Sequence, residues 1–217
     1  MNVERIDVAG ASPVRGILQP AAATGADGLV LTHGAGGSAD TPLLVAVAEA
    51  FAARGITVLR CDLPYRQARS RGGPSPAGAE RDREGLRAAL RVLRNRVSGR
   101  LFLGGHSYGG RQASMLLAAE PALATALLLQ SYPLHPPGRP RILRTAHFPD
   151  LSVPTLFVHG TTDPFGSLAE LDQARALIPG RTALLKVNGG HDLGWSQKRG
   201  DVTLPEHIAE AFLQVTG

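Results

Sequence analysis

The stretch Leu101-Phe102-Leu103-Gly104-Gly105-His106-Ser107-Tyr108-Gly109-Gly110 joins a short apolar run to a segment with helical spacing. The run Leu101–Leu103 predicts a buried strand, and the residues from Gln112 to Glu120 predict a helix. Gly105 to Gly109 match the pattern G-x-S-x-G, which places a serine on a tight turn from strand to helix. Glycines beside such a serine avoid a collision with both elements. We therefore predict that Ser107 is a nucleophile at the amino end of a helix, where free N–H groups favour negative charge.

Short apolar runs alternate with amphipathic segments along the rest of the chain, a pattern typical of a parallel sheet covered on both faces. The runs that we expect as strands are Leu29–Thr32, Ile56–Cys61, Leu101–Leu103, Ala126–Gln130, Thr155–His159 and Ala183–Val187. Val3–Val8 and Val14–Leu18 predict an antiparallel hairpin at one edge. The predicted fold class is therefore α/β, with a mostly parallel sheet of about seven to eight strands and helices on both faces.

Residues suited to the start of a helix occur at three places: Thr41 before Pro42, Ser167 with Glu170, and Thr203 with Glu206. Two segments interrupt the alternation. Residues 62–79 are rich in Arg, Gly and Pro and predict an exposed loop. Residues 131–150 are rich in proline and too short for a lid domain, so we expect a short flap there. We expect one domain over residues 1–217.

Composition narrows the classes of partner. The net charge is +5, but the arginines are scattered and no nucleic-acid-binding signature accompanies them, so we expect no nucleic-acid partner. No apolar stretch approaches the roughly 18 residues that span a bilayer, so we expect no membrane partner. The first residues, Met1 to Asp7, lack the apolar core of a signal peptide, and Cys61 is the only cysteine. The expected location is the cytoplasm.

Two later loops carry the side chains that would activate Ser107. A serine hydroxyl needs a histidine to take its proton and a carboxylate to orient that imidazole. In an open α/β sheet these partners follow the carboxyl ends of later strands. Asp163 follows one predicted strand and His191 follows the next, in the order serine, acid, histidine that such a turn requires. We predict a triad of Ser107, Asp163 and His191, with Asp150 as the alternative acid.

A tetrahedral intermediate also needs two backbone N–H donors. One is expected from Tyr108, the residue after the nucleophile. The other is expected from the glycine-rich loop 33–38, with Ala35 as the first choice and Gly36 as the second. The loop lacks the lysine of a phosphate-binding P-loop and the G-x-G-x-x-G pattern of a dinucleotide site, so we expect neither a cofactor nor a metal.

The chain resembles the α/β-hydrolase superfamily over essentially its whole length. The residues that carry the resemblance are Thr32–Gly37, Gly104–Gly110, His159–Asp163 and Gly190-His191. They look like those of the small lidless hydrolases called dienelactone-hydrolase-like, a group that includes a testis-expressed protein and a chromatin-complex subunit. True dienelactone hydrolases use a cysteine where this chain has Ser107. The resemblance therefore implies a serine hydrolase that cleaves an ester or a thioester.

The first hypothesis is hydrolysis of a small-molecule acyl substrate through an acyl-enzyme on Ser107. The alternative is a catalytically silent scaffold or binding protein, because some proteins with this fold only bind. The expected cleft is shallow. The aromatic residues that we expect to line it are Tyr132, Phe165 and Trp195, and the cations that we expect to meet a substrate carboxylate are Arg66, Arg139 and Arg141.

Overall fold

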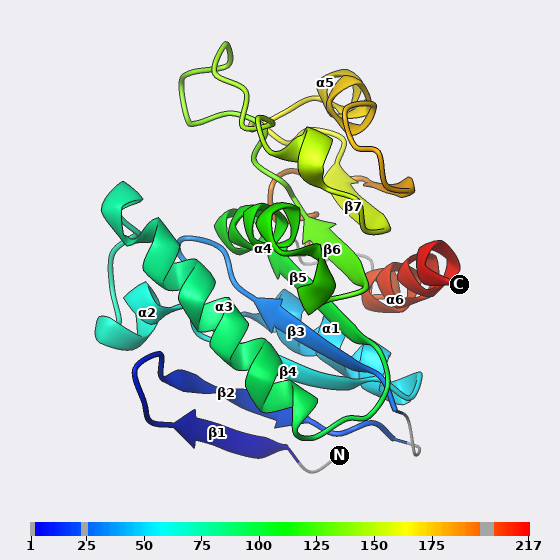
Figure 1. Cartoon of the computed structure of the whole chain (residues 1–217). Helices are drawn as coiled ribbons and strands as arrows, with labels where there is room; N and C mark the ends of the chain where they lie inside the picture. Colours follow the sequence, from blue (N-terminus) through cyan, green and yellow to red (C-terminus); the bar gives the residue numbers. More distant parts are fainter. Residues whose placement is uncertain (1–2, 23–25, 196–201) are drawn as a thin grey trace.

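A computed structural model describes residues 3–22, 26–195 and 202–217, and in this part of the chain an eight-stranded sheet forms the centre (Figure 1). The strand order is β1-β2-β4-β3-β5-β6-β7-β8. The strands are β1 (Glu4–Val8), β2 (Val14–Gln19), β3 (Gly28–Thr32), β4 (Thr57–Cys61), β5 (Leu101–His106), β6 (Ala126–Gln130), β7 (Thr155–Gly160) and β8 (Thr182–Val187). The pairs β1–β2 and β2–β4 are antiparallel, and the other pairs are parallel. The predicted fold class and edge hairpin are confirmed.

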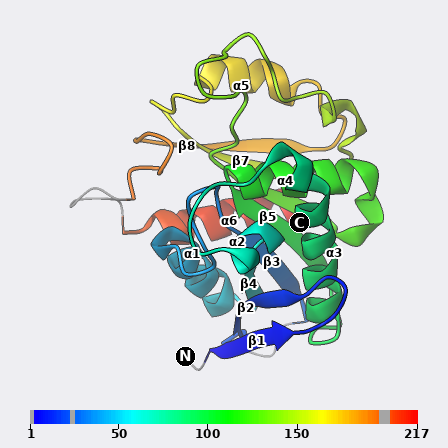
Figure 2. The same ribbon diagram turned by 90° about the vertical axis from the view of Figure 1, so that its left-hand side faces the viewer.

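Helices cover both faces of the sheet, and Figure 2 shows the sheet between the two layers. Helices α1 (Pro42–Ala53) and α6 (Leu204–Thr216) pack on one face. Helices α3 (Ala79–Arg94), α4 (Tyr108–Ala119) and α5 (Leu168–Arg175) pack on the other. Within the described residues, no helix is both long and apolar enough to cross a membrane.

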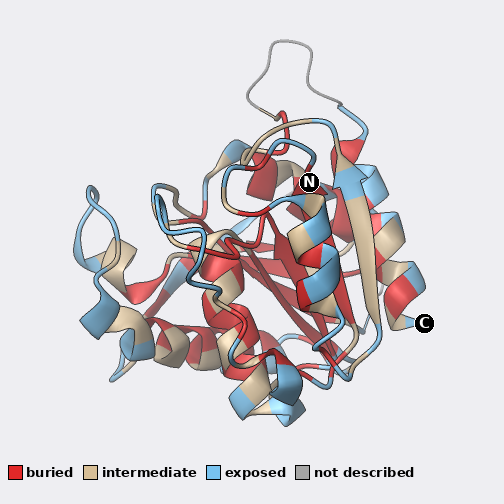
Figure 3. Cartoon of the chain, turned by 90° about the horizontal axis from the view of Figure 1, so that it is seen from above, coloured by how far each residue is buried: buried red, intermediate tan, exposed pale blue. Residues whose placement is uncertain are grey.

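The central strands are largely apolar because both of their faces are buried (Figure 3). Successive side chains of a strand point to opposite faces, so Leu29 and Leu31 join the core under α1 and α6 while Val30 joins the core under α3 and α4. In the core under α1 and α6, the ring of Phe212 meets that of Phe102 edge to face, with the ring centres 5.3 Å apart. Burying each such side chain contributes about 1.5–3 kcal/mol.

The strand before Ser107 is longer than predicted, and the helix after it begins earlier. Strand β5 continues to His106, and α4 starts at Tyr108 rather than at Gln112. A Cβ on Gly104 would lie 2.9 Å from the Cβ of Leu128 on the neighbouring strand. Only a hydrogen atom fits at this position between β5 and β6, so a strand that continues here must carry glycine. Apolar periodicity does not reveal this packing constraint.

The stretch predicted as a loop at residues 62–79 is partly helical, so the expectation of a loop throughout is wrong. It contains α2 (Pro64–Ala68) and the 3-10 helix Pro76–Gly78. Pro64 occupies the first turn of α2, where its missing N–H costs nothing. Its ring packs against α3 so closely that a Cβ on Gly85 would lie 2.6 Å from Pro64 Cγ.

The segment predicted as a flap at residues 131–150 is buried at its start and exposed in its middle. The side chains of Tyr132, Leu134 and Phe148 are fully buried, and residues 137–143 form the longest exposed stretch of the segment. These apolar side chains pack against the sheet and α4, and their burial stabilises the two ends of the segment.

The helix starts agree with the sequence in part. Ser167 and Glu170 form the predicted capping box, with each side chain bonded to the other's backbone N–H. Thr203 and Thr41 make no capping bond to their helices, and the Thr41 hydroxyl donates instead to the Ser38 carbonyl, at 2.8 Å. The expected capping box at Thr203 is therefore wrong.

Candidate active site

Ser107 lies at the sharp turn between β5 and α4, with φ 50° and ψ −116°. Such left-handed backbone angles are strained for a residue with a side chain. The turn is possible because its neighbours lack side chains: a Cβ on Gly105 would lie 2.7 Å from the Gly110 nitrogen, and one on Gly109 would lie 2.6 Å from Thr32 Cγ2. The glycines thus let α4 approach β3 and β5, and Ser107 lines a cleft at the turn.

The structure brings Ser107, His191 and Asp163 together in one hydrogen-bonded chain. His191 Nε2 lies 2.7 Å from Ser107 Oγ, and His191 Nδ1 lies 2.8 Å from Asp163 Oδ2. Since the carboxylate only accepts, Nδ1 carries the proton and Nε2 is free to accept from the serine hydroxyl. Asp163 is 6% exposed, and its Oδ1 accepts the Phe165 N–H at 2.8 Å. Burial alone would raise the pKa of Asp163, but the bonds from His191 and Phe165 outweigh it, so the pKa is lowered.

The imidazole of His191 lies between two further rings. The Phe165 ring meets it edge-on, with ring centres 4.5 Å apart, and the His106 ring lies 5.3 Å away. His106 Nε2 donates to the backbone carbonyl of His191 at 2.9 Å. Burial lowers the pKa of His106 to about 4, so this ring is neutral at pH 7. Sequence reasoning missed this support for the His191 loop, although His106 directly precedes Ser107.

The glycine-rich loop after β3 lies against Ser107. A Cβ on Gly34 would lie 3.3 Å from Ser107 Cβ. The Tyr65 hydroxyl lies 3.1 Å from the Gly34 carbonyl and 3.0 Å from the Ala35 carbonyl. Arg66 Nη2 also donates to the Ala35 carbonyl, at 3.1 Å. In a trans peptide the N–H points opposite to the C=O, so the N–H groups of Ala35 and Gly36 face away from Tyr65.

A buried carboxylate joins α2 to the turn at Ser107. Asp82 of α3 is 1% exposed, and it accepts the Tyr108 hydroxyl at 2.7 Å and the Tyr65 N–H at 3.1 Å. Burial raises the pKa of Asp82, against the lowering effect of these two bonds. Sequence reasoning missed Asp82 because it lies in an arginine-rich stretch that resembles a solvated helix face. It thus holds the side chain of Tyr108, a predicted N–H donor, and the backbone of Tyr65, whose hydroxyl bonds the glycine-rich loop.

A cleft of about 980 Å³ opens over Ser107 and His191. Phe165 lines it, as the sequence predicts. Tyr132 does not, because its ring is fully buried between Phe148 and Phe157 and its hydroxyl donates to the Arg144 carbonyl at 2.6 Å. The expectation that Tyr132 lines the cleft is therefore wrong.

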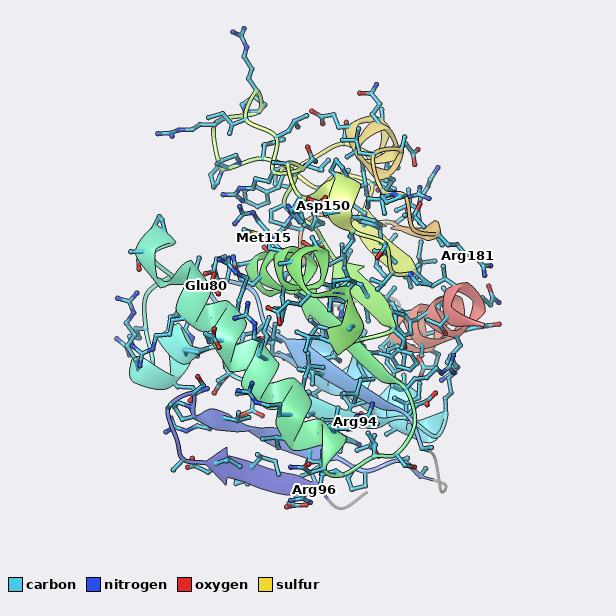
Figure 4. All side chains as sticks on the ribbon, viewed as in Figure 1. Glu80, Arg94, Arg96, Met115, Asp150 and Arg181 are labelled. Atoms are coloured by element: carbon cyan, nitrogen blue, oxygen red, sulfur yellow. The ribbon has the colours of Figure 1, made fainter. Side chains whose placement is uncertain are left out.

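Trp195 is also absent from the lining of the cleft, because it packs on the core under α1 and α6. Asp150, the alternative acid, ends the 3-10 helix Phe148–Asp150 beside α4, where Figure 4 labels it near Met115. The carboxylate bonded to His191 is that of Asp163. Within the described residues, no group of three or more His, Cys, Asp or Glu side chains could hold a metal ion.

The arginines in the cleft are not those expected from the sequence. Arg139 and Arg141 are exposed on the stretch 137–143 and do not line the cleft over Ser107. The guanidinium of Arg66 donates to backbone carbonyls of the glycine-rich loop and of the residues that follow α2. The arginines that line the cleft are Arg83, Arg111 and Arg144. They come from α3, α4 and the segment 131–150, which only the tertiary structure brings together.

The comparisons agree with this architecture. Residues 25–217 match a family model described as "Alpha/beta hydrolase domain". A dienelactone hydrolase from Anabaena variabilis is similar in structure, with a TM-score of 0.77, 21% identity, and coverage of 98% of this chain and 97% of that one. A serine hydrolase without lid from Xanthomonas campestris gives a TM-score of 0.77 at 18% identity, covering 98% and 94%. An esterase from Pyrococcus furiosus gives 0.75 at 14% identity, covering 100% and 93%. The chain therefore belongs to the alpha/beta hydrolase domain family and has the fold of its small lidless members.

Proposed function

We propose that this protein is a serine hydrolase that cleaves a carboxylic ester or thioester through Ser107, His191 and Asp163. The observation that carries the proposal is the continuous hydrogen-bonded chain from Asp163 through both nitrogens of His191 to Ser107 Oγ, at 2.8 and 2.7 Å. This is the arrangement in which a histidine takes the proton of a serine nucleophile while a carboxylate holds the imidazole in its reactive tautomer.

In the first half of the reaction, Ser107 Oγ attacks the carbonyl carbon of the substrate as its proton passes to Nε2 of His191. The carbonyl electron pair moves to oxygen, and the resulting imidazolium is stabilised by Asp163. When the oxyanion collapses, the bond to the alcohol or thiol breaks and His191 gives its proton to the leaving group. An acyl group remains on Ser107.

Water completes the cycle. It loses a proton to His191 as it attacks the acyl carbon, and Ser107 leaves with that proton. Both tetrahedral intermediates need N–H donors near the developing oxyanion. We assign the N–H groups of Tyr108 and Ala35 to this role. Ala35 is preferred over Gly36 because the peptide from Gly34 to Ala35 is the one next to Ser107.

The names of the structural relatives favour acyl-ester chemistry, because they include a dienelactone hydrolase and an esterase. At 21% identity or less these relatives share the fold, so their substrates are not carried over. A non-catalytic scaffold is the alternative. It would not need the strained backbone of Ser107, which costs about 1–3 kcal/mol, or the hydrogen bond between Ser107 and His191.

Labelling with a fluorophosphonate probe tests the proposal. We expect a covalent adduct on Ser107, together with hydrolysis of short-chain p-nitrophenyl esters and thioesters, and the loss of both in Ser107→Ala. The matched control is Ser114→Ala, since Ser114 Oγ also lies 2.8 Å from a histidine nitrogen, Nε2 of His147, but outside the cleft. Absence of an adduct in a folded wild-type sample, or an adduct that survives in Ser107→Ala, would refute the assignment.

A further inference from the structure

Arg111 presents a positive charge to the cleft one helical turn from the nucleophile. It lies four residues after Ser107 on α4, and its backbone N–H donates to the Ser107 carbonyl at 3.0 Å. Its side chain lines the cleft, and its Nε is buried with no hydrogen-bond partner among the described residues. No carboxylate within the described residues lies close enough to form an ion pair with it.

Arg144 brings a second such charge to the same cleft from the segment 131–150. Its backbone N–H donates to the Leu134 carbonyl at 2.7 Å, and its carbonyl accepts the Tyr132 hydroxyl at 2.6 Å. The backbone is thus fixed, while the guanidinium has no ion-pair partner in the part of the chain that the structure describes. Burial, followed by repulsion from Arg111, lowers the pKa of Arg144. The two guanidinium groups therefore line the same cleft, and neither has a carboxylate partner among the described residues.

The third arginine of the cleft differs, because its charge is already compensated. Arg83 bonds Glu80, at the start of α3, and its Nη1 donates to Gln112 Oε1 at 2.9 Å. Figure 4 shows Glu80 there, beside α4. None of the described residues that line the cleft is acidic. The uncompensated charge of the cleft thus lies on Arg111 and Arg144.

Two like charges held partly out of water destabilise the empty protein, and an anion between them removes that cost. A guanidinium binds planar or tetrahedral oxyanions through paired N–H groups. Because Arg111 is one helical turn, about 5.4 Å, along α4 from Ser107, the anion would be joined to the ester by only a few bonds.

We propose that Arg111 and Arg144 form a subsite for an oxyanion of the substrate, so that the protein prefers small esters carrying a carboxylate or a phosphate near the scissile bond. This inference rests on the proposed function. It replaces Arg66, Arg139 and Arg141, the cations expected from the sequence, by two others.

Paired esters test the preference. Monomethyl glutarate and methyl valerate differ only in a terminal carboxylate on the acyl side, and 4-acetoxybutyrate and butyl acetate differ in the same way on the alcohol side. Methyl 4-phosphonobutyrate supplies the phosphorus oxyanion. With hydrolysis followed by pH-stat, we expect kcat/KM to favour the anionic member of at least one pair. Arg111→Gln and Arg144→Gln should each lower that preference on the order of 10- to 100-fold and change the neutral esters little.

Arg139→Gln is the matched control, since Arg139 is exposed and does not line the cleft. It should keep the wild-type preference. If Arg111→Gln fails to fold, Arg144→Gln carries the test, because Arg144 lies outside the helices and its substitution leaves α4 unchanged. The inference is overturned if no pair shows a preference in the wild type, or if the preference survives in both cleft variants or is lost equally in Arg139→Gln.

Binding separates this inference from the proposed function. Calorimetric titration of Ser107→Ala with glutarate, and with inorganic phosphate, measures the subsite without turnover. If the wild type shows neither turnover nor labelling, but glutarate still binds and Arg144→Gln abolishes that binding, the proposed hydrolase function is refuted and the anion site stands. Normal turnover of neutral esters with no anion binding would refute only the anion site.

Discussion

Replacing Asp163 by asparagine keeps the shape of the side chain and reverses one hydrogen bond. The backbone N–H of Phe165 donates to Oδ1 at 2.8 Å, so the amide oxygen of the variant must occupy that position. The amide NH2 then faces Nδ1 of His191, where the carboxylate now accepts at 2.8 Å. His191 responds by moving its proton to Nε2, which can no longer accept the proton of Ser107.

The size of the effect follows from these bonds. To regain the reactive tautomer, the variant must place two N–H donors against each other, at about 1–3 kcal/mol for each unpaired donor. The imidazolium also loses a charge-assisted hydrogen bond worth about 1.5–3 kcal/mol. A total of about 5 kcal/mol lowers kcat by about 10³- to 10⁴-fold.

Steady-state hydrolysis of a p-nitrophenyl ester measures this loss, with circular dichroism and thermal melting to establish that the variant folds. Asp150→Asn is the matched control, because Asp150 is the other acid that the sequence allows and is exposed beside α4. It should retain wild-type kcat. A folded Asp163→Asn with more than about a tenth of wild-type kcat would contradict the reasoning, as would an equal loss in Asp150→Asn.

Three further predictions follow from the same geometry. Gly109→Ala places a Cβ 2.6 Å from Thr32 Cγ2, so it should destabilise the protein by about 1–3 kcal/mol in urea unfolding and lower kcat; unchanged stability would refute the packing argument. Tyr65→Phe removes the hydroxyl bonded to the Gly34 carbonyl at 3.1 Å, and should lower kcat about tenfold with KM unchanged; a change in KM alone would contradict a positioning role. The lowered pKa of Asp163 stabilises the fold fully above about pH 4, where an unfolded aspartate is ionised, and this contribution is lost as pH falls through the folded pKa. Urea unfolding between pH 6 and 3 should therefore show that the free energy of unfolding falls more steeply with decreasing pH in the wild type than in Asp163→Asn. Equal pH dependence in the two proteins would contradict this role of Asp163.

The sequence by itself predicted the sheet and the order of the three side chains along the chain. Apolar runs identify buried strands because parallel strands are covered on both faces. The G-x-S-x-G pattern identifies the turn because its backbone angles and close contacts exclude larger neighbours, a constraint that acts over five residues. Asp163 and His191 could be selected because loops after parallel strands meet at one edge of a sheet.

Only the tertiary structure decided which side chains surround Ser107. Tyr132 is in the core and Asp82 links α2 to the start of α4, although nothing in their local sequence separates a buried side chain from an exposed one. Arg111 and Arg144 share the cleft because α4 and the segment 131–150 pack together there, whereas Arg139 is exposed and does not line it. Local periodicity sets where strands and turns form. The composition of a cleft depends on contacts between residues far apart in the chain, and these contacts are settled only when the helices and loops pack on the sheet.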